Sequence, residues 1–311
     1  MALGDSFSSG EGAPVDVGLL GDRWWKLATV ASTDGWLGDT GENGCHRSRE
    51  AYAPRVWADL DARDTNWGVS FRACSGATSS AYYQSFKGED PQSWSFDDFR
   101  RLGQADLVTI GFGGNDLGFA DIVRDCVGEG FVEERIGNSA PSRLVAKYDF
   151  CRNKWTPIVE KRLTVVSLRL SDLIDQVRPN LKPGGKILVV GYPRPFRDNP
   201  PAQCRSGAGI EGGIDRPTMN WLNSGVADPL NWILARESAY AGVSFIDTSR
   251  FMTAFGDHDL CSQDRWMNRL IESDKNQSFH PKSEYHEKVA EAILRCWDEC
   301  PPTGPRIVEH A

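Results

Sequence analysis

Apolar residues occur along the chain in short runs that are bounded by glycine, proline or polar residues. Four of these runs have the length of a strand and cover residues 67–74, 105–111, 186–191 and 243–247, and residues 2–3 form the stub of a further strand at the start. Uninterrupted runs of this kind, rich in β-branched residues, are typical of strands buried on both faces of a parallel sheet. The pattern therefore predicts a five-stranded, mostly parallel sheet.

Longer amphipathic stretches separate these runs and predict helices. The predicted helices cover residues 48–60, 155–177, 219–240 and 283–297. Ser48 is the expected N-cap of the first helix, and the second stops before Pro179. Alternation of strands and helices implies right-handed crossovers and a three-layer α/β/α sandwich. Residues 7–44 and 127–150 are expected to form long loops.

Charge and hydropathy exclude several classes of partner. The 311 residues include 35 Lys and Arg against 43 Asp and Glu, which gives a net charge of −8. A negative surface disfavours nucleic acids and anionic membranes as partners. The densest apolar run, 186–191, is far shorter than the ~18 residues that would span a bilayer. Neither a nucleic-acid partner nor a transmembrane segment is expected.

Eight cysteines without zinc-type spacing favour disulfides and an oxidising compartment. The first residues, Met1-Ala2-Leu3, lead directly into Gly4-Asp5-Ser6, without the basic and apolar segments of a signal peptide. We therefore expect a mature secreted or extracellular domain whose signal peptide has been removed. The alternative is a cytosolic chain with reduced cysteines.

Four motifs carry residues suited to nucleophilic catalysis. Ser6, Gly76 and Asn115 follow the first three predicted strands, and His280 precedes the last predicted helix. The carboxyl ends of parallel strands meet at one edge of a sheet, where ligands of α/β proteins bind. Ester hydrolysis requires a nucleophile, a proton acceptor and N–H donors for an oxyanion. Taken singly, Ser6 or His280 could cap a helix and Asn115 could belong to a turn.

Motifs for other chemistry are missing from the sequence. There is no Gly-x-Ser-x-Gly elbow, no phosphate-binding Gly-Lys-Ser/Thr loop and no complete dinucleotide fingerprint. The five histidines show no metal-ligand spacing. We expect neither a metal nor a cofactor.

The four motifs in combination resemble the sequence blocks of the SGNH, or GDSL-type, serine hydrolases. They read Gly4-Asp-Ser-Phe-Ser-Ser-Gly10, Ala73-Cys-Ser-Gly-Ala-Thr78, Gly113-Gly-Asn-Asp116 and Phe279-His-Pro281, in the family's order along nearly the whole chain. The resemblance implies an SGNH-hydrolase, flavodoxin-like fold and a carboxylic ester hydrolase. It looks closest to the secreted, disulfide-bonded esterase and lipase branch.

The resemblance also implies roles for individual residues. Ser6 would be the nucleophile and His280 its base, with an oxyanion hole formed by the N–H groups of Ser6 and Gly76 and the amide of Asn115. One position departs from the family, since Gln277 stands where most members have an Asp three residues before the histidine. Some secreted relatives orient the histidine with a main-chain carbonyl, which Gln277 or Ser278 could supply. Asp274 is the less favoured alternative.

Disulfide pairing follows from chain order and from the same resemblance. Both favour Cys45–Cys74, Cys126–Cys151 and Cys204–Cys261, whereas eight cysteines alone would allow 105 connectivities. Cys296 and Cys300 are left over and could bridge locally or remain free. Trp24-Trp25, on the long loop after Ser6, could pack as loop anchors or line an acyl or sugar subsite.

The sequence thus predicts one SGNH hydrolase domain over residues 1–300, a tail over 301–311, and a monomer acting on a small-molecule, lipid or glycan ester. Ser6 and His280 would form and hydrolyse an acyl-enzyme. Two alternatives remain: an acyltransferase that uses the same dyad, and a scaffold that binds lipid or glycan without catalysis. The acyl chain and alcohol of the substrate stay open.

Overall fold

The computed structural model describes residues 1–13, 43–64, 67–95, 104–123, 125–126, 145–207, 210–269 and 277–305. Its central sheet has four parallel strands: β1 (Ala2–Gly4), β2 (Ala105–Gly111), β3 (Leu181–Val190) and β6 (Ser244–Ile246). Their order is β1-β2-β3-β6. The parallel sheet is as the sequence predicts.

The prediction of a strand over residues 67–74 is wrong, since the structure has no strand there. This segment runs beside β1 but forms one isolated bridge, between Ala2 and Phe71. β1 is only three residues long, and at its end the side chain of Gln92 bonds both the N–H and the oxygen of Gly4, although this oxygen also accepts from Cys74 N at 3.1 Å. The Gly4 N–H donates to Gln92 Oε1 at 2.9 Å instead of to the neighbouring backbone, which interrupts the ladder.

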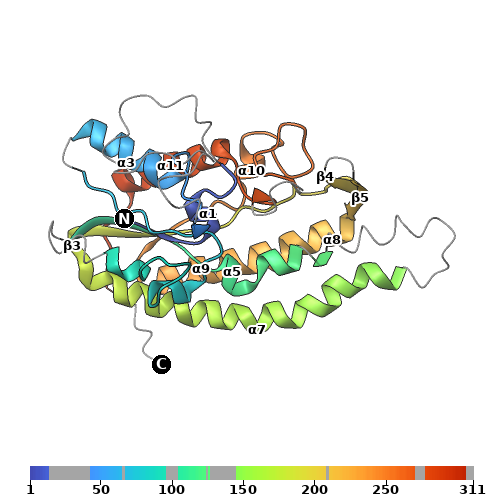
Figure 1. Cartoon of the computed structure of the whole chain (residues 1–311), viewed down its shortest axis with the longest axis horizontal. Coiled ribbons are helices and arrows are strands. Elements are labelled where there is room, and N and C mark those ends of the chain that lie inside the picture. Colours follow the sequence, from blue (N-terminus) through green and yellow to red (C-terminus); the bar gives the residue numbers. More distant parts are fainter. Residues whose placement is uncertain are drawn as a thin grey trace.

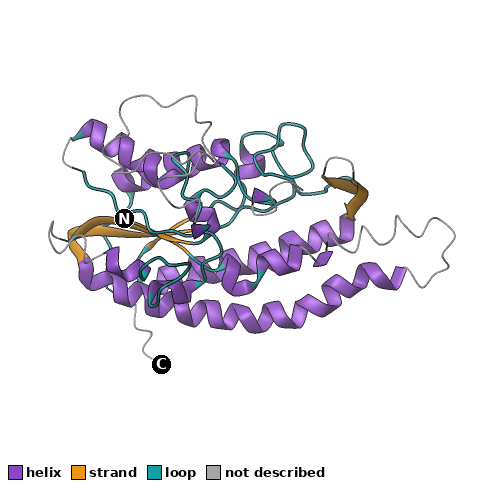
Figure 2. Cartoon of the chain, in the orientation of Figure 1, coloured by secondary structure: helices purple, strands orange, loops and turns teal. Residues whose placement is uncertain are grey.

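Helices cover both faces of the sheet and complete the three layers (Figures 1 and 2). On one face α3 packs against α11, and on the other α7 packs against α9. The helices are α3 (Tyr52–Arg63), α7 (Val145–Val177), α9 (Asp228–Tyr240) and α11 (Ser283–Glu299). Shorter helices are α1 (Ser6–Ser9), α5 (Gly114–Leu117), α8 (Arg216–Trp221) and α10 (Phe251–Ala254).

Residues buried between these layers form the core. Val108 and Ile110 of β2 and Leu188 and Val189 of β3 have no exposed surface. Burial of each such side chain stabilises the fold by about 1.5–3 kcal/mol. The uninterrupted apolar runs seen in the sequence are therefore explained by strands that are covered on both faces.

Three helix boundaries differ from the predictions. Ala51, not Ser48, is the N-cap of α3, because the Ser48 hydroxyl accepts from Glu50 N at 3.0 Å and closes a turn before the helix. α7 begins at Val145, within the predicted loop 127–150, and residues 127–144 lie outside the described part. The predicted helix 219–240 is divided into α8, a π-helical segment over Leu222–Ala227, and α9.

A second, antiparallel sheet is absent from the predictions. It consists of β4 (Gln203–Gly207) and β5 (Ile210–Asp215) and lies apart from the central sheet (Figure 1). Cys204 of β4 is joined to Cys261, which anchors this hairpin.

The eight cysteines form four disulfides. Cys45–Cys74, Cys126–Cys151 and Cys204–Cys261 are the pairs that chain order and the family resemblance favour. Cys296 and Cys300, whose state the sequence left open, form a fourth bridge at the end of α11. The Cys45–Cys74 disulfide attaches the segment that contains Gly76 to the segment around Cys45.

The described part of the expected tail, residues 301–305, lies against the sheet. Thr303 N donates to Gly185 O at 3.1 Å, and its hydroxyl accepts from Ile187 N at 2.8 Å. Residues 306–311 lie outside the described part. No helix among the described residues is long and apolar enough to cross a membrane.

Candidate active site

Ser6 lies where β1 ends and α1 begins. Asp5 is the N-cap of α1 and accepts from Phe7 N at 3.0 Å, so Ser6 is the first helical residue and not the cap. Gly4 is required before it, since a Cβ there would lie 2.6 Å from Gly111 O. This close approach of β1 and β2 brings Ser6 to the carboxyl edge of the sheet, where it is only 5% exposed.

His280 lies against Ser6. Its Nε2 is 2.8 Å from Ser6 Oγ, and its Nδ1 is 3.0 Å from the main-chain oxygen of Ser278. A carbonyl oxygen can only accept, so Nδ1 carries the hydrogen and Nε2 presents its lone pair to the serine hydroxyl. In this tautomer Nε2 is able to accept a proton from Ser6.

The Ser278 carbonyl, one of the groups considered for orienting His280, lies at the Nδ1 of its ring. The main-chain oxygen of Gln277 instead accepts from the backbone N–H of His280 at 3.3 Å. Asp274 lies outside the described residues.

The loop that carries His280 is tied to the segment after α1. Asn268 exchanges backbone hydrogen bonds with this loop, to Phe279 N at 3.0 Å and to His280 O at 2.9 Å. Its side chain also donates to Gly12 O at 2.9 Å. At Gly12 a Cβ would lie 2.3 Å from Pro281 O, so the two segments can approach only because this residue is glycine.

The loops that carry Gly76 and Asn115 are hydrogen-bonded to the end of β1 and to each other. Cys74 N donates to Gly4 O at 3.1 Å, which fixes the loop of Gly76 beside the end of β1. Asn115 Nδ2 donates to Ala77 O at 3.0 Å and joins the third motif to the second. Gly76 has a positive φ of 81° and is exposed. In the described part of the chain, the N–H groups of Ser6 and Gly76 donate no hydrogen bond.

Asp116 strengthens the junction between the second and third motifs. Its carboxylate accepts from Ser79 N at 2.9 Å and from Ser79 Oγ at 2.6 Å, and Arg169 of α7 lies 2.8 Å away. The Asp116 side chain is only 2% exposed, and buried charges need such partners. The sequence motif contains Asp116, but its partners come from distant segments.

Tyr192 links two of the sequence motifs although it belongs to none of them. Its hydroxyl donates to Asp5 Oδ2 at 2.6 Å and accepts from Gly114 N at 3.0 Å, so it joins the first and third motifs. Burial raises the pKa of Asp5 to about 7, although the hydrogen bond from Tyr192 opposes this shift. No local pattern marks Tyr192, because its role depends on the position of β3.

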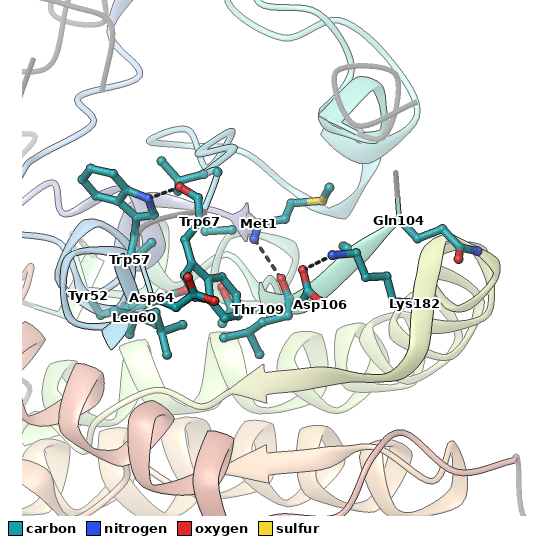
Figure 3. Close-up of a pocket in the computed structure, with 17 residues that line it drawn as sticks. Met1, Tyr52, Trp57, Leu60, Asp64, Trp67, Gln104, Asp106, Thr109 and Lys182 are labelled. Carbon is teal, nitrogen blue, oxygen red and sulfur yellow. Dashed lines mark hydrogen bonds and ion pairs between the residues drawn. The ribbon is translucent and has the colours of Figure 1, made fainter. Parts of the chain in front are cut away.

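A cavity of about 550 Å³ lies at the other end of the strands (Figure 3). It is lined by Met1, by Trp57 of α3 and by residues at the amino end of β2, where Asp106 pairs with Lys182 at 2.7 Å. It therefore does not belong to the site at Ser6. In the described ranges, no group of His, Cys, Asp or Glu is arranged to hold a metal ion.

Trp24 and Trp25, which were considered for substrate binding, lie outside the described residues. Trp67 packs edge-on against Trp297 with ring centroids 5.4 Å apart, which is a packing contact between the segment before Cys74 and α11. Trp94 is 49% exposed.

The chain is similar to lipases from Streptomyces. It is 28% identical over 288 residues to a lipase from Streptomyces rimosus, covering 93% of this chain and 82% of that protein. It is 27% identical over 281 residues to Lipase 1 of Streptomyces coelicolor, covering 90% and 80%.

Solved structures share the fold. The extracellular lipase of Streptomyces rimosus matches with a TM-score of 0.60 at 22% identity, covering 94% of this chain and 97% of that one. Phospholipase A1 from Streptomyces albidoflavus matches with a TM-score of 0.61 at 24% identity, covering 94% and 96%. Residues 2–288 match the profile of the GDSL-like lipase/acylhydrolase family, and the chain therefore belongs to this family of ester hydrolases.

Proposed function

We propose that the protein is a serine-dependent carboxylic ester hydrolase in which Ser6 is the nucleophile and His280 the general base. The 2.8 Å contact between Ser6 Oγ and His280 Nε2 carries this proposal, together with the carbonyl that fixes the imidazole tautomer. A hydroxyl next to a neutral, oriented imidazole is the arrangement that activates serine.

In the first half of the reaction Ser6 Oγ attacks the ester carbonyl carbon while its proton passes to His280 Nε2. The carbonyl π electrons move onto oxygen, and the N–H groups of Ser6 and Gly76 and the Asn115 amide donate to the resulting oxyanion. When the tetrahedral intermediate collapses, the carbon–alkoxide bond breaks. The leaving alkoxide takes the proton from His280, and the acyl group remains on Ser6.

In the second half water attacks the acyl-enzyme, and His280 takes a proton from it. Collapse of the second tetrahedral intermediate releases the carboxylic acid and returns the proton to Ser6. The carbonyl of Ser278 stabilises the transient imidazolium, although less than a carboxylate would.

The substrate is proposed to be a lipid-type acyl ester. Support comes from the Streptomyces relatives, which are named lipases and match the chain over most of its length. We also propose that the protein is secreted, since four disulfides suit an oxidising compartment.

The test combines turnover with covalent labelling. A series of p-nitrophenyl esters from acetyl to long acyl, with a phospholipid and acetylated xylan beside it, is assayed with wild type and Ser6→Ala. A fluorophosphonate probe is expected to label wild type and not Ser6→Ala, and turnover should be lost in the variant. Preference for acetyl esters would contradict the lipid assignment, and turnover by pure, folded Ser6→Ala would contradict the mechanism. Acyl transfer to an added alcohol, exceeding release of free acid, would indicate an acyltransferase instead.

A further inference from the structure

Lys87 lies in a turn whose backbone does not suit a lysine. Phe86 and Glu89 exchange backbone hydrogen bonds at 3.1 and 3.0 Å and enclose a two-residue turn. Both central residues have positive φ, 52° at Lys87 and 78° at Gly88, as in a type I′ turn. The first position of such a turn favours Asn, Asp or Gly, because other residues are strained there. A lysine at this position suggests a role for its side chain.

The Lys87 ammonium group binds two main-chain oxygens beside the proposed oxyanion hole. Nζ donates to Gly44 O at 2.6 Å and to Ser75 O at 2.8 Å. The carbonyl of Ser75 and the N–H of Gly76 belong to the same peptide group. The lysine therefore holds one end of the peptide whose other end is the proposed oxyanion donor.

We propose that Lys87 is a positioning residue that orients and polarises the Ser75–Gly76 peptide, so that the Gly76 N–H becomes a stronger donor to the oxyanion. This inference rests on the proposed function. A positive donor at a carbonyl draws electron density toward oxygen and leaves the N–H of that peptide more positive. Hydrogen bonds in a chain reinforce one another in this way.

Simple tethering does not account for this contact. The segments that Nζ joins are already connected by the Cys45–Cys74 disulfide and by the hydrogen bond from Ser75 N to Cys45 O at 2.9 Å. The Lys87 side chain therefore adds little to loop closure. What it does supply, and the disulfide cannot, is a positive charge and a hydrogen bond at Ser75 O.

The surroundings of Lys87 are compatible with a charged ammonium group. Burial lowers the pKa of Lys87, and the negative charge of Glu11 opposes this shift. Glu11 is fully buried, and its carboxylate lies 2.8 Å from His46 Nδ1. Glu89, at the end of the turn, pairs with Arg47 at 2.7 Å, and the positive charge of Arg72 also acts on Glu89.

The choice of substitution separates catalysis from folding. Lys87→Asn removes the ammonium group but places a residue that tolerates the left-handed backbone, so the turn should be at least as stable as in wild type. Lys87→Arg keeps a positive donor in the same place. Lys182→Met is the control, because Lys182 pairs with Asp106 at the opposite end of the strands.

The experiment measures kcat and KM on p-nitrophenyl butyrate, thermal unfolding, and inhibition by a trifluoromethyl ketone that forms an oxyanion on the serine. In Lys87→Asn we expect kcat to fall about 5- to 50-fold, less than the ~10²–10³-fold loss of a whole oxyanion donor. KM should change less than about twofold, and inhibition should weaken in parallel with kcat. Lys87→Arg should recover most of kcat, and Lys182→Met should match wild type.

The possible outcomes distinguish failure of the role of Lys87 from failure of the proposed function. A Lys87→Asn variant with wild-type kcat and inhibition would overturn the role of Lys87 while wild type still turns over and is labelled at Ser6. An equal loss in Lys87→Asn and Lys87→Arg, accompanied by lower thermal stability in both, would assign the residue a structural role. A wild type that neither hydrolyses esters nor reacts with a fluorophosphonate would remove the proposed function itself, and this inference with it. Should Lys87→Asn not fold, Lys87→Met provides the same comparison.

Discussion

His280 Nε2 lies 2.8 Å from Ser6 Oγ, although 274 positions separate the two residues in the chain. The contact is possible because β1 and the loop before α11 end at the same edge of the sheet. Gly12 lets that loop approach closely. The arrangement also leaves Nδ1 facing the main-chain carbonyl of Ser278, which orients the proposed base.

Asp274→Asn is expected to change kcat by less than about threefold. The Ser278 carbonyl already accepts the hydrogen of Nδ1, so the ring needs no second acceptor there. Replacement of a triad carboxylate by an amide instead costs about 10⁴-fold in kcat. Steady-state hydrolysis of a p-nitrophenyl ester measures the difference. A loss of 10³-fold or more in folded protein would assign the orienting role to Asp274.

Asn115→Ala is expected to lower kcat by about 10²–10³-fold, because one of the three proposed oxyanion donors is removed. Its effect on KM should be small, since the oxyanion exists only along the reaction path. Asn220→Ala, at an exposed position of α8, is the matched control and should keep wild-type kcat. The Asn115 amide also bonds Ala77 O, so thermal unfolding must accompany the kinetics. A variant with unchanged kcat would exclude Asn115 from the oxyanion hole.

Several parts of this fold can be predicted from the sequence because they depend on local pattern. The apolar run 105–111 has the bounds of β2, and α11 begins at Ser283, where its amphipathic pattern starts. Ser6, Gly76, Asn115 and His280 could be singled out because each stands next to a strand end or a helix start.

Other parts depend on contacts between distant segments. The segment 67–74 has the composition of a strand, but the N–H of Gly4 that would continue the ladder donates to Gln92 instead. Tyr192 and Lys87 carry no motif, since each gains its place only when a separate segment supplies its partner. The β4–β5 hairpin contains few apolar residues and so gives no clear pattern.

Gly12→Ala is expected to reduce kcat by at least ~10-fold. A methyl group there would lie 2.3 Å from Pro281 O, and backbone must move to relieve the overlap, which displaces His280 from Ser6. Small displacements of a catalytic group can cost as much as 10²-fold. Gly304→Ala is the control, because its nearest neighbour would be Gly242 O at 3.7 Å, an ordinary contact. Equal activity in the two variants would show that the loop carrying His280 tolerates the shift.

His286→Leu is expected to make the stability of the protein less sensitive to acid. His286 of α11 is fully buried, and neither ring nitrogen has a hydrogen-bond partner among the described residues. Burial lowers its pKa from 6.5 to about 3. Between these two pH values the unfolded chain binds a proton that the folded protein does not, so the contribution is present above pH 6.5 and is lost as the pH falls toward 3.

Urea unfolding at pH 8 and pH 5 measures this contribution. Protonation of the unfolded histidine should lower the free energy of unfolding of wild type by about 2 kcal/mol at pH 5 relative to pH 8. Over the same pH interval, the free energy of unfolding of His286→Leu should fall by about 2 kcal/mol less than that of wild type. This holds whatever the stability of the variant at pH 8. Comparing the two pH values within each protein cancels the effect of the substitution on packing. Equal pH dependence in the two proteins would mean that His286 is protonated in the folded state, or hydrated there, over this range.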